Sequence, residues 1–152
     1  MKHVFVMDPV ESVLVDKDST FALMLEAQRR GHEVSIALVE DLFVQGSEAR
    51  AVTRGATLRP VQGDHATLGE PREVALGSAD VVWMRKDPPF HMGYIFNTYV
   101  LDFAARDTLV VNAPRGLRDI NEKVWQDLSD AEKKIITDAA RTVEAEMADS
   151  YA

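Results

Sequence analysis

Short apolar runs alternate with longer amphipathic segments along most of the chain. Four runs are closed by polar or turn-forming residues, which is typical of buried strands. They lie near residues 4–7, 34–38, 80–84 and 108–111. Amphipathic segments follow the first and third runs, and strand, helix and strand in succession form parallel βαβ units. The pattern therefore predicts an α/β fold with three layers and a mainly parallel sheet.

The two amphipathic segments predict helices over 20–30 and 90–106. Asp18 and Ser19 are both good N-cap residues for the first helix, and Gly31 is a natural residue just past its end. In the second helix, apolar residues recur with helical spacing, and we expect the face they form to be buried. Its members are Ile95, Phe96, Tyr99, Val100 and Phe103.

The segments outside this alternation are of two kinds. Residues 40–77 have weak periodicity and predict a hairpin or β-ribbon, whereas 117–126 and 129–150 predict helices. Ser129 and Glu132 have the spacing of a capping box at the start of the last helix. Its apolar stripe consists of Leu128, Ile135, Ile136, Ala139, Val143 and Met147. Because a wet apolar stripe forfeits burial free energy, we expect this helix to pack on the same chain or, failing that, to form a homodimer.

The composition disfavours or excludes several classes of function. A net charge of -8 disfavours binding to nucleic acids and to anionic membranes. The absence of Cys excludes disulfides, thiol nucleophiles and thiolate metal sites. No apolar run approaches the roughly 20 residues that span a bilayer. The N-terminus enters a strand pattern without a signal-peptide pattern, so we expect a cytoplasmic protein. We expect it to be either a monomer or a homodimer.

Charged residues follow the predicted strands, and in a parallel sheet these strand ends share one edge. Ligands bind at such an edge, near the point where the strand order reverses. Asp18 and Ser19 at the start of the first helix face the same edge. The basic residues expected to form one cationic rim there are Arg85, Lys86, Arg115 and Arg118. Such a rim suits a carboxylate or phosphate, although charges at strand ends also solvate loops and cap helices.

No catalytic or metal-binding constellation is visible. The four His residues are scattered without metal-ligand spacing, and they are His3, His32, His65 and His91. The chain has no G-x-G-x-x-G and no phosphate-binding loop. We therefore assign no catalytic residue, no metal and no cofactor to this chain.

Several ungapped motifs, in the same order, resemble a known family. They are Val6-Met7-Asp8-Pro9, residues 17–22, residues 25–32, Met84-Arg85-Lys86-Asp87-Pro88-Pro89-Phe90, Val111-Asn112-Ala113-Pro114 and Leu117-Arg118-Asp119. Over residues 1–123 the chain resembles the Rossmann-like (pre-ATP-grasp) N-terminal domain of prokaryotic glutathione synthetase. That family joins glycine to γ-glutamylcysteine with ATP and magnesium, which its later ATP-grasp domains hold. The resemblance implies part of a peptide-substrate surface near Asp18, Ser19, Arg85 and Lys86. Arg118, a member of the expected cationic rim, is a further candidate for substrate binding.

Residues 124–152 depart from that family. Residues 121–136 are similar to a late helix of solute-binding proteins of tripartite periplasmic transporters, with a comparable Asn-x-Lys-x-Trp, Leu-Ser and Lys-Ile-Ile pattern. Two resemblances that meet near Lys123 favour an engineered or recombined chimera, with an appended helical segment packing on the first domain.

Three interpretations of function follow. The first is a non-catalytic recombined scaffold. The second is a natural fragment or subunit of a glutathione synthetase that needs separate ATP-grasp domains. The third is a module that weakly binds a γ-glutamyl peptide or another small anion. On all three, we expect no glutathione synthetase activity from the chain alone, because phosphoryl transfer needs a nucleotide site and magnesium ligands.

Overall fold

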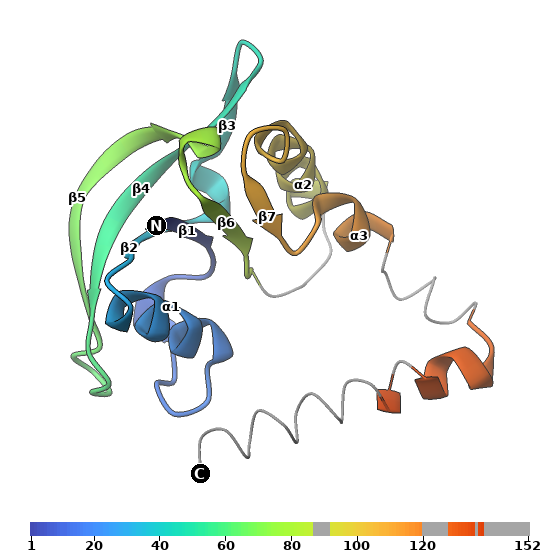
Figure 1. The fold of residues 1–152 in the computed structure, drawn as a ribbon, viewed down its shortest axis with the longest axis horizontal. Helices are drawn as coiled ribbons and strands as arrows, with labels where there is room; N and C mark the ends of the chain where they lie inside the picture. The colour runs from blue at the N-terminus through green and yellow to red at the C-terminus, as the bar shows by residue number, and fades with distance from the viewer. Residues whose placement is uncertain (87–91, 120–127, 136, 139–152) are drawn as a thin grey trace. The chain divides into compact units, whose positions relative to one another are not determined.

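The computed structural model describes residues 1–86, 92–119, 128–135 and 137–138. The chain divides into two compact units, Met1–Arg118 and Asp119–Ala152, which are described separately below. The first unit contains the whole sheet and the helices packed on it (Figure 1). Within the described residues, no helix is long and apolar enough to cross a membrane.

The first unit is built on one seven-stranded sheet. Its strands are β1 (Lys2–Val6), β2 (Glu33–Ala37), β3 (Leu42–Gln45), β4 (Glu48–Leu58), β5 (Ala66–Ala75), β6 (Val81–Met84) and β7 (Leu109–Val111). The order is β3-β4-β2-β1-β6-β7, with β5 paired to β4. Strands β2, β1, β6 and β7 run parallel to one another, so the predicted parallel core is confirmed.

The predicted ribbon over residues 40–77 is also confirmed, as antiparallel strands that continue the parallel core. Strand β4 pairs with β3, with β5 and, at Ser35 and Ile36, with β2. A bulge interrupts the β4–β5 register between Arg54 and Ala56. The two long strands curve away from the parallel core and return (Figure 1). Short 3-10 turns at Val10–Ser12, Val39–Asp41 and Leu76–Ser78 connect elements of the sheet.

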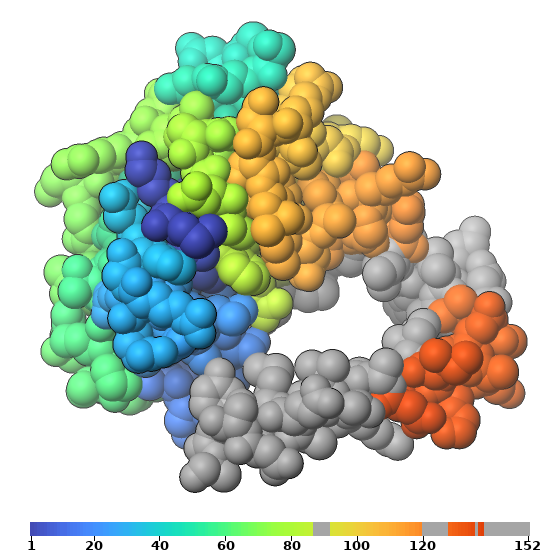
Figure 2. Space-filling view, viewed as in Figure 1, coloured from blue at the N-terminus to red at the C-terminus, as the bar shows by residue number. Residues whose placement is uncertain are grey.

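Alternation along β1 divides the core into two layers. Val4 and Val6 belong to a cluster with α2 (Met92–Ala104), whereas Phe5 belongs to a cluster with α1 (Ser19–Arg29). Because successive strand side chains point to opposite faces, this division places α1 and α2 on opposite faces of the sheet. The three-layer prediction is therefore confirmed. In the space-filling view, the N-terminal residues and α1 are visible on the same side of the molecule (Figure 2).

The prediction for the buried face of α2 is partly wrong. Phe96 and Tyr99 are 59% and 50% exposed, whereas Thr98 and Leu101 are completely buried. Ile95, Val100 and Phe103 are half-buried. The physical reason is that α2 is apolar on nearly every side, so the spacing of its apolar residues does not mark which side meets the sheet. Residues 90 and 91 of the predicted helix lie outside the described residues.

The C-terminal predictions are tested only in part. Helix α3 (Pro114–Asp119) covers the start of the helix predicted over 117–126, and residues 120–126 lie outside the described residues. In the second unit, residues 130–135 and 137–138 are helical. The capping box is confirmed, because the Ser129 backbone N–H donates to Glu132 Oε2 at 2.8 Å and the Glu132 N–H donates to Ser129 Oγ at 3.3 Å. The packing of this helix stays a prediction, since most of its apolar stripe lies outside the described residues.

Candidate functional site

The order of the parallel strands places a switch point between β1 and β6. From β1 the chain crosses to β2 on one side, and it later returns to β6 on the other side. In open α/β sheets, the crevice outside the carboxyl ends of two such strands is where ligands bind. Asp8 follows β1, and Arg85 and Lys86 follow β6, so these residues flank that crevice.

Arg85 is held against the first turn of α1. Its Nε donates to Thr20 Oγ1 at 3.0 Å, and its Nη2 donates to Ser19 Oγ at 2.9 Å. Thr20 is buried, which fixes one end of the guanidinium. Both partners are neutral hydroxyls, and Arg85 has no carboxylate partner among the described residues. Its positive charge is therefore uncompensated at the switch point, beside the positive end of the α1 dipole.

Lys86, in contrast, is neutralised locally. Its Nζ lies 2.9 Å from Asp8 Oδ1 and 3.1 Å from Asp8 Oδ2. The Lys86 side chain is 19% exposed and that of Asp8 is 40% exposed. The pair thus joins the ends of β1 and β6, and it offers a carboxylate and an ammonium group side by side at the rim of the crevice.

Asp18 caps α1, which is the role its position predicted. Its Oδ1 accepts from the Phe21 backbone N–H at 2.8 Å. The carboxylate is thereby committed to the helix terminus, and it holds Ser19 and Thr20 where Arg85 meets them. The substrate role assigned to Asp18 and Ser19 stays a prediction. The contact of Thr20 was not predictable from local pattern, because the partner of its hydroxyl is 65 residues away in the chain.

Arg118 is engaged on α2. Its Nη2 lies 2.7 Å from Asp102 Oδ2, its Nη1 donates to Thr98 Oγ1 at 3.1 Å, and its guanidinium stacks on the Tyr99 ring at 4.4 Å. Of the residues expected to form one cationic rim, Arg85 and Lys86 lie at the switch point. The described contacts of Arg118 are with α2. Arg115 is exposed on α3. A binding role for Arg118 stays a prediction.

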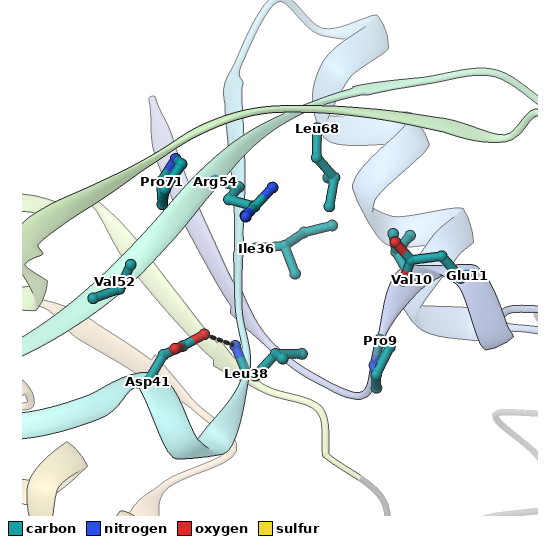
Figure 3. Close-up of a pocket in the computed structure, with 10 residues that line it drawn as sticks. All are labelled: Pro9, Val10, Glu11, Ile36, Leu38, Asp41, Val52, Arg54, Leu68 and Pro71. Carbon is teal, nitrogen blue, oxygen red and sulfur yellow. Dashed lines mark hydrogen bonds between the residues drawn. The ribbon is translucent and has the colours of Figure 1, made fainter.

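A cavity of about 430 Å³ adjoins the crevice on the β2 side. It is lined by Pro9, Val10, Glu11, Ile36, Leu38, Asp41, Val52, Arg54, Leu68 and Pro71. The side chain of Arg54 lies near the middle of this group, which is otherwise largely apolar (Figure 3). Asp41 Oδ2 accepts from the Leu38 N–H at 3.2 Å, which fixes the turn after β2. The sequence did not reveal this cavity, because its outer wall is the curved β4–β5 ribbon.

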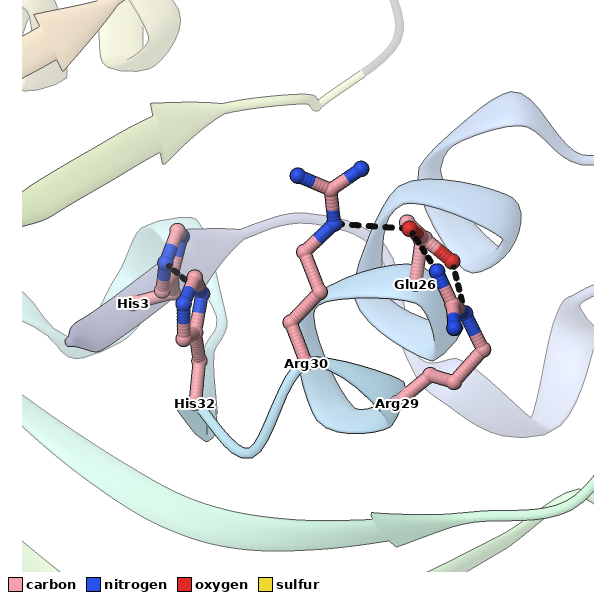
Figure 4. A network of polar contacts seen from close by, with 5 residues as sticks. All are labelled: His3, Glu26, Arg29, Arg30 and His32. Atoms are coloured by element: carbon pink, nitrogen blue, oxygen red, sulfur yellow. Dashed lines mark hydrogen bonds and ion pairs between the residues drawn. The ribbon is translucent and has the colours of Figure 1, made fainter.

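A second polar group lies at the opposite, amino-terminal end of β1. His3 Nε2 and His32 Nδ1 are 3.0 Å apart (Figure 4). The Trp83 indole N–H donates to His3 Nδ1 at 3.0 Å. Burial, and then the charge of His32, lower the pKa of His3. His3 is buried and accepts a hydrogen bond from Trp83, which makes it part of the core.

Near these histidines, α1 carries an exposed ionic network at its C-terminal end. Glu26 pairs with Arg29 at 2.6 Å and with Arg30 at 2.7 Å (Figure 4). Hydrogen bonds from Arg29 and Arg30 lower the pKa of Glu26 to about 2. These pairs solvate the outer face of the helix and leave no group suited to chemistry.

The expected absence of a metal and of a cofactor from this chain stays a prediction. No group of three or more His, Cys, Asp or Glu side chains within the described part of the chain is arranged to hold a metal ion. The carboxylate of Asp8 at the switch point is paired with Lys86. Together with Arg85, the geometry suits the recognition of an anion.

The comparisons with known proteins agree with this geometry. A sequence model described as "Prokaryotic glutathione synthetase, N-terminal domain" matches residues 1–118. The chain is 45% identical over 119 residues to the glutathione synthetase of Bradyrhizobium diazoefficiens, which covers 78% of this chain. It is 43% and 42% identical over 121 residues to the glutathione synthetases of Salmonella typhi and Escherichia coli, which cover 79%.

The matched part is the smaller part of those relatives, because the chain spans 38% of the length of each. The match includes the sheet, both layers of helices and the switch-point residues. The resemblance of residues 121–136 to solute-binding proteins stays a prediction. The chain belongs to the prokaryotic glutathione synthetase family, and residues 1–118 are its N-terminal domain.

Proposed function

We propose that this domain supplies the peptide-binding side of an ATP-dependent glutathione synthetase. In this proposal, it binds a γ-glutamyl peptide at the crevice between β1 and β6 and depends on ATP-grasp domains for catalysis. The observation that carries the proposal is the uncompensated guanidinium of Arg85, which is oriented by Ser19 and Thr20. An oriented Arg with remaining N–H donors is suited to a bidentate carboxylate.

The neighbouring pair matches the rest of such a ligand. The amino-acid end of a γ-glutamyl peptide carries a carboxylate and an ammonium group on one carbon atom. Arg85 suits the carboxylate, and Asp8 suits the ammonium group, with Lys86 balancing the charge of Asp8. A zwitterionic ligand brings one negative and one positive group to these residues. Each charge that leaves water then has a partner of opposite sign, which limits the free-energy cost of desolvation.

Catalysis by the chain alone is not part of the proposal. Phosphoryl transfer needs groups that stabilise charge on the phosphates and on a bound metal. The described residues offer no metal cluster, and the relatives are longer than this chain. We expect no ADP formation when purified protein is mixed with ATP, magnesium, γ-glutamylcysteine and glycine. ADP formation that depends on both γ-glutamylcysteine and glycine would overturn this expectation.

The recombined scaffold is the competing interpretation. Similarity to glutathione synthetases at 42–45% identity supports a natural fragment or subunit better than a scaffold. Both interpretations contain the same switch-point residues, so ligand binding tests the peptide-binding role and not the origin of the chain.

Calorimetric titration with γ-glutamylcysteine tests the proposal. We expect weak binding that Arg85→Met lowers by at least about tenfold, equivalent to roughly 1.4 kcal/mol. Arg72→Met is the matched control, because Arg72 is an exposed Arg on β5 outside the crevice. A melting curve establishes that each variant is folded. Equal affinity of Arg85→Met and the parent, or no binding by the folded parent, would count against the proposal.

A further inference from the structure

The cavity on the β2 side of the switch point contains a basic side chain that is not neutralised. The cavity measures about 430 Å³ and is enclosed by the 3-10 turn Val10–Ser12, the end of β2 and the β4–β5 ribbon (Figure 3). The Arg54 side chain extends from β4 into it and has no hydrogen-bond or ion-pair partner among the described residues. Arg50, on the same strand, is paired with Glu48 and Glu73. The ribbon therefore neutralises Arg50 and leaves the charge of Arg54 at the cavity.

The walls around Arg54 are largely apolar. The side chains that form them include Pro9, Val10, Ile36, Leu38, Val52 and Leu68. Apolar side chains offer no hydrogen-bond acceptor to a guanidinium, so an anion that reaches Arg54 gains a charge-assisted hydrogen bond there. Arg54 is exposed, which gives such an anion access from solvent. The cavity thus matches a ligand with one anionic group and an apolar body.

The backbone is irregular at the position of Arg54. The β4–β5 register shifts between Arg54 and Ala56, so a bulge lies next to Arg54. Across the ribbon, Arg54 is paired with Pro71, which also lines the cavity. Bulges re-aim side chains and are frequent next to active sites. The bulge therefore gives a reason, independent of the cavity, to treat Arg54 as a directed side chain.

Two carboxylates limit the charge of a ligand in this cavity. Asp41 accepts from the Leu38 backbone N–H, and Glu11 is exposed at the cavity. Two acidic groups beside one Arg repel a ligand with several negative charges, whereas a single carboxylate is matched by Arg54. The volume is in the range of cavities that hold small organic molecules.

We propose that this cavity is a second ligand site, which binds a small organic monocarboxylate with an aliphatic body. The carboxylate accepts hydrogen bonds from Arg54, and the aliphatic body packs on the apolar walls. The cavity is separate from the crevice between β1 and β6, because its lining does not include Asp8, Arg85 or Lys86. The proposal therefore does not rest on the peptide-binding role of that crevice.

The probe is N-acetyl-leucine, which joins one carboxylate to an aliphatic side chain. N-acetyl-leucinamide is a neutral control of nearly the same shape, and acetate is a control without the aliphatic body. In an NMR titration of the 152-residue chain, N-acetyl-leucine should bind with a dissociation constant of about 1 mM. The amide and acetate should each bind at least about tenfold more weakly, because each lacks one of the two matched parts.

The backbone signals that shift in this titration locate the bound probe. Signals of residues 36–41, 52–54 and 68–71 should shift, whereas those of Ser19, Thr20 and Arg85 should not. Shifts confined to Ser19, Thr20 and Arg85 would overturn the proposal. Equal affinity for the acid and its amide, or no binding of the acid, would also overturn it.

Arg54→Met tests the proposed anchor. This variant should bind N-acetyl-leucine and N-acetyl-leucinamide with equal, weak affinity, because the partner of the carboxylate is gone. Arg72→Met is the matched control, because Arg72 is also exposed on the ribbon but does not line this cavity. Arg72→Met should keep the preference for the acid. A preference for the acid that survives in Arg54→Met would rule out Arg54 as the anchor and overturn the proposal.

Titration with γ-glutamylcysteine distinguishes this cavity from the crevice. Arg54→Met should bind the peptide as the parent does, and Arg85→Met should bind N-acetyl-leucine as the parent does. A parent that binds N-acetyl-leucine but no peptide supports the second site and counts against the proposed function alone. Loss of peptide binding in Arg54→Met would mean that the cavity is part of the crevice, which overturns the second site.

Discussion

Helices α1 and α2 cover opposite faces of the same sheet, but only α1 has a charged outer side. The outer side of α1 carries Glu26, Arg29 and Arg30 in an ionic network, and its one exposed large apolar side chain is Leu23. The outer side of α2 carries Met92, Phe96 and Tyr99, which are 61%, 59% and 50% exposed. The two helices therefore have similarly apolar inner sides and different outer sides, one charged and one apolar.

The inner sides provide the largest expected effect. Met24 on α1 and Leu101 on α2 are both completely buried. Met24→Ala and Leu101→Ala should each lower the free energy of unfolding by about 2–5 kcal/mol, because each leaves a cavity in a packed core. Urea denaturation measures both losses. A loss for Leu101→Ala below about 1 kcal/mol would show that α2 packs only loosely on the sheet. The inner sides of α1 and α2 would then not be equivalent.

A smaller effect is expected where α1 is anchored to the ribbon. Gln28 donates to the Leu58 carbonyl at 2.9 Å and accepts from the Leu58 N–H at 2.7 Å. Gln28→Met leaves both backbone groups without these partners, and it should cost about 1–3 kcal/mol in urea denaturation. Arg29→Met is the control on the same helix, because its exposed ion pair contributes little. Equal effects of the two variants would refute the role of Gln28 as an anchor.

The pH dependence of stability should reveal His3 at the amino-terminal end of β1. The folded chain lowers the pKa of His3 through burial and the charges of His32 and the N-terminus, while Asp80 acts in the opposite direction. Below the ordinary His pKa of about 6.5, the unfolded chain binds this proton more readily, so stability falls as the pH decreases. Urea midpoints between pH 7.5 and about 5 measure the slope.

His3→Gln is the matched variant, since Gln retains an acceptor for the Trp83 N–H. Its urea midpoint should fall less steeply than that of the parent as the pH decreases. Identical slopes in the two proteins would exclude His3 as the source of the pH dependence.

The smallest effect is expected on the exposed apolar side of α2, which contains Met92, Phe96 and Tyr99. Phe96→Glu exchanges an exposed ring for a charge, so the free energy of unfolding should change by no more than about 0.5 kcal/mol. Binding of a dye that fluoresces on apolar surfaces should decrease in the same variant. Strong destabilisation by Phe96→Glu would mean that the ring is buried in solution, and the contrast between the two helices would disappear.

The strands and α1 were predictable because each depends on local pattern. The apolar runs at 4–7 and 34–38 are short and bounded by turns, and Asp18 caps the helix between them. The proximity of Arg85 and Lys86 to the start of α1 followed from parallel topology alone. The inner side of α2 was not predictable, since its sequence is apolar on both sides. The cavity around Arg54 was not predictable either, because it depends on how far the ribbon curves.

The outer strand of the ribbon has a consequence for how the protein behaves at high concentration. Strand β5 has ten residues, and within the described residues it pairs only with β4. A long free edge of this kind is a template for polymerisation into fibres. Pro71 interrupts the row of N–H donors near its middle, and Glu70, Arg72 and Glu73 place charges beside it. The bulge opposite adds twist, so a second flat strand fits this edge poorly and the domain is protected from sheet-to-sheet aggregation.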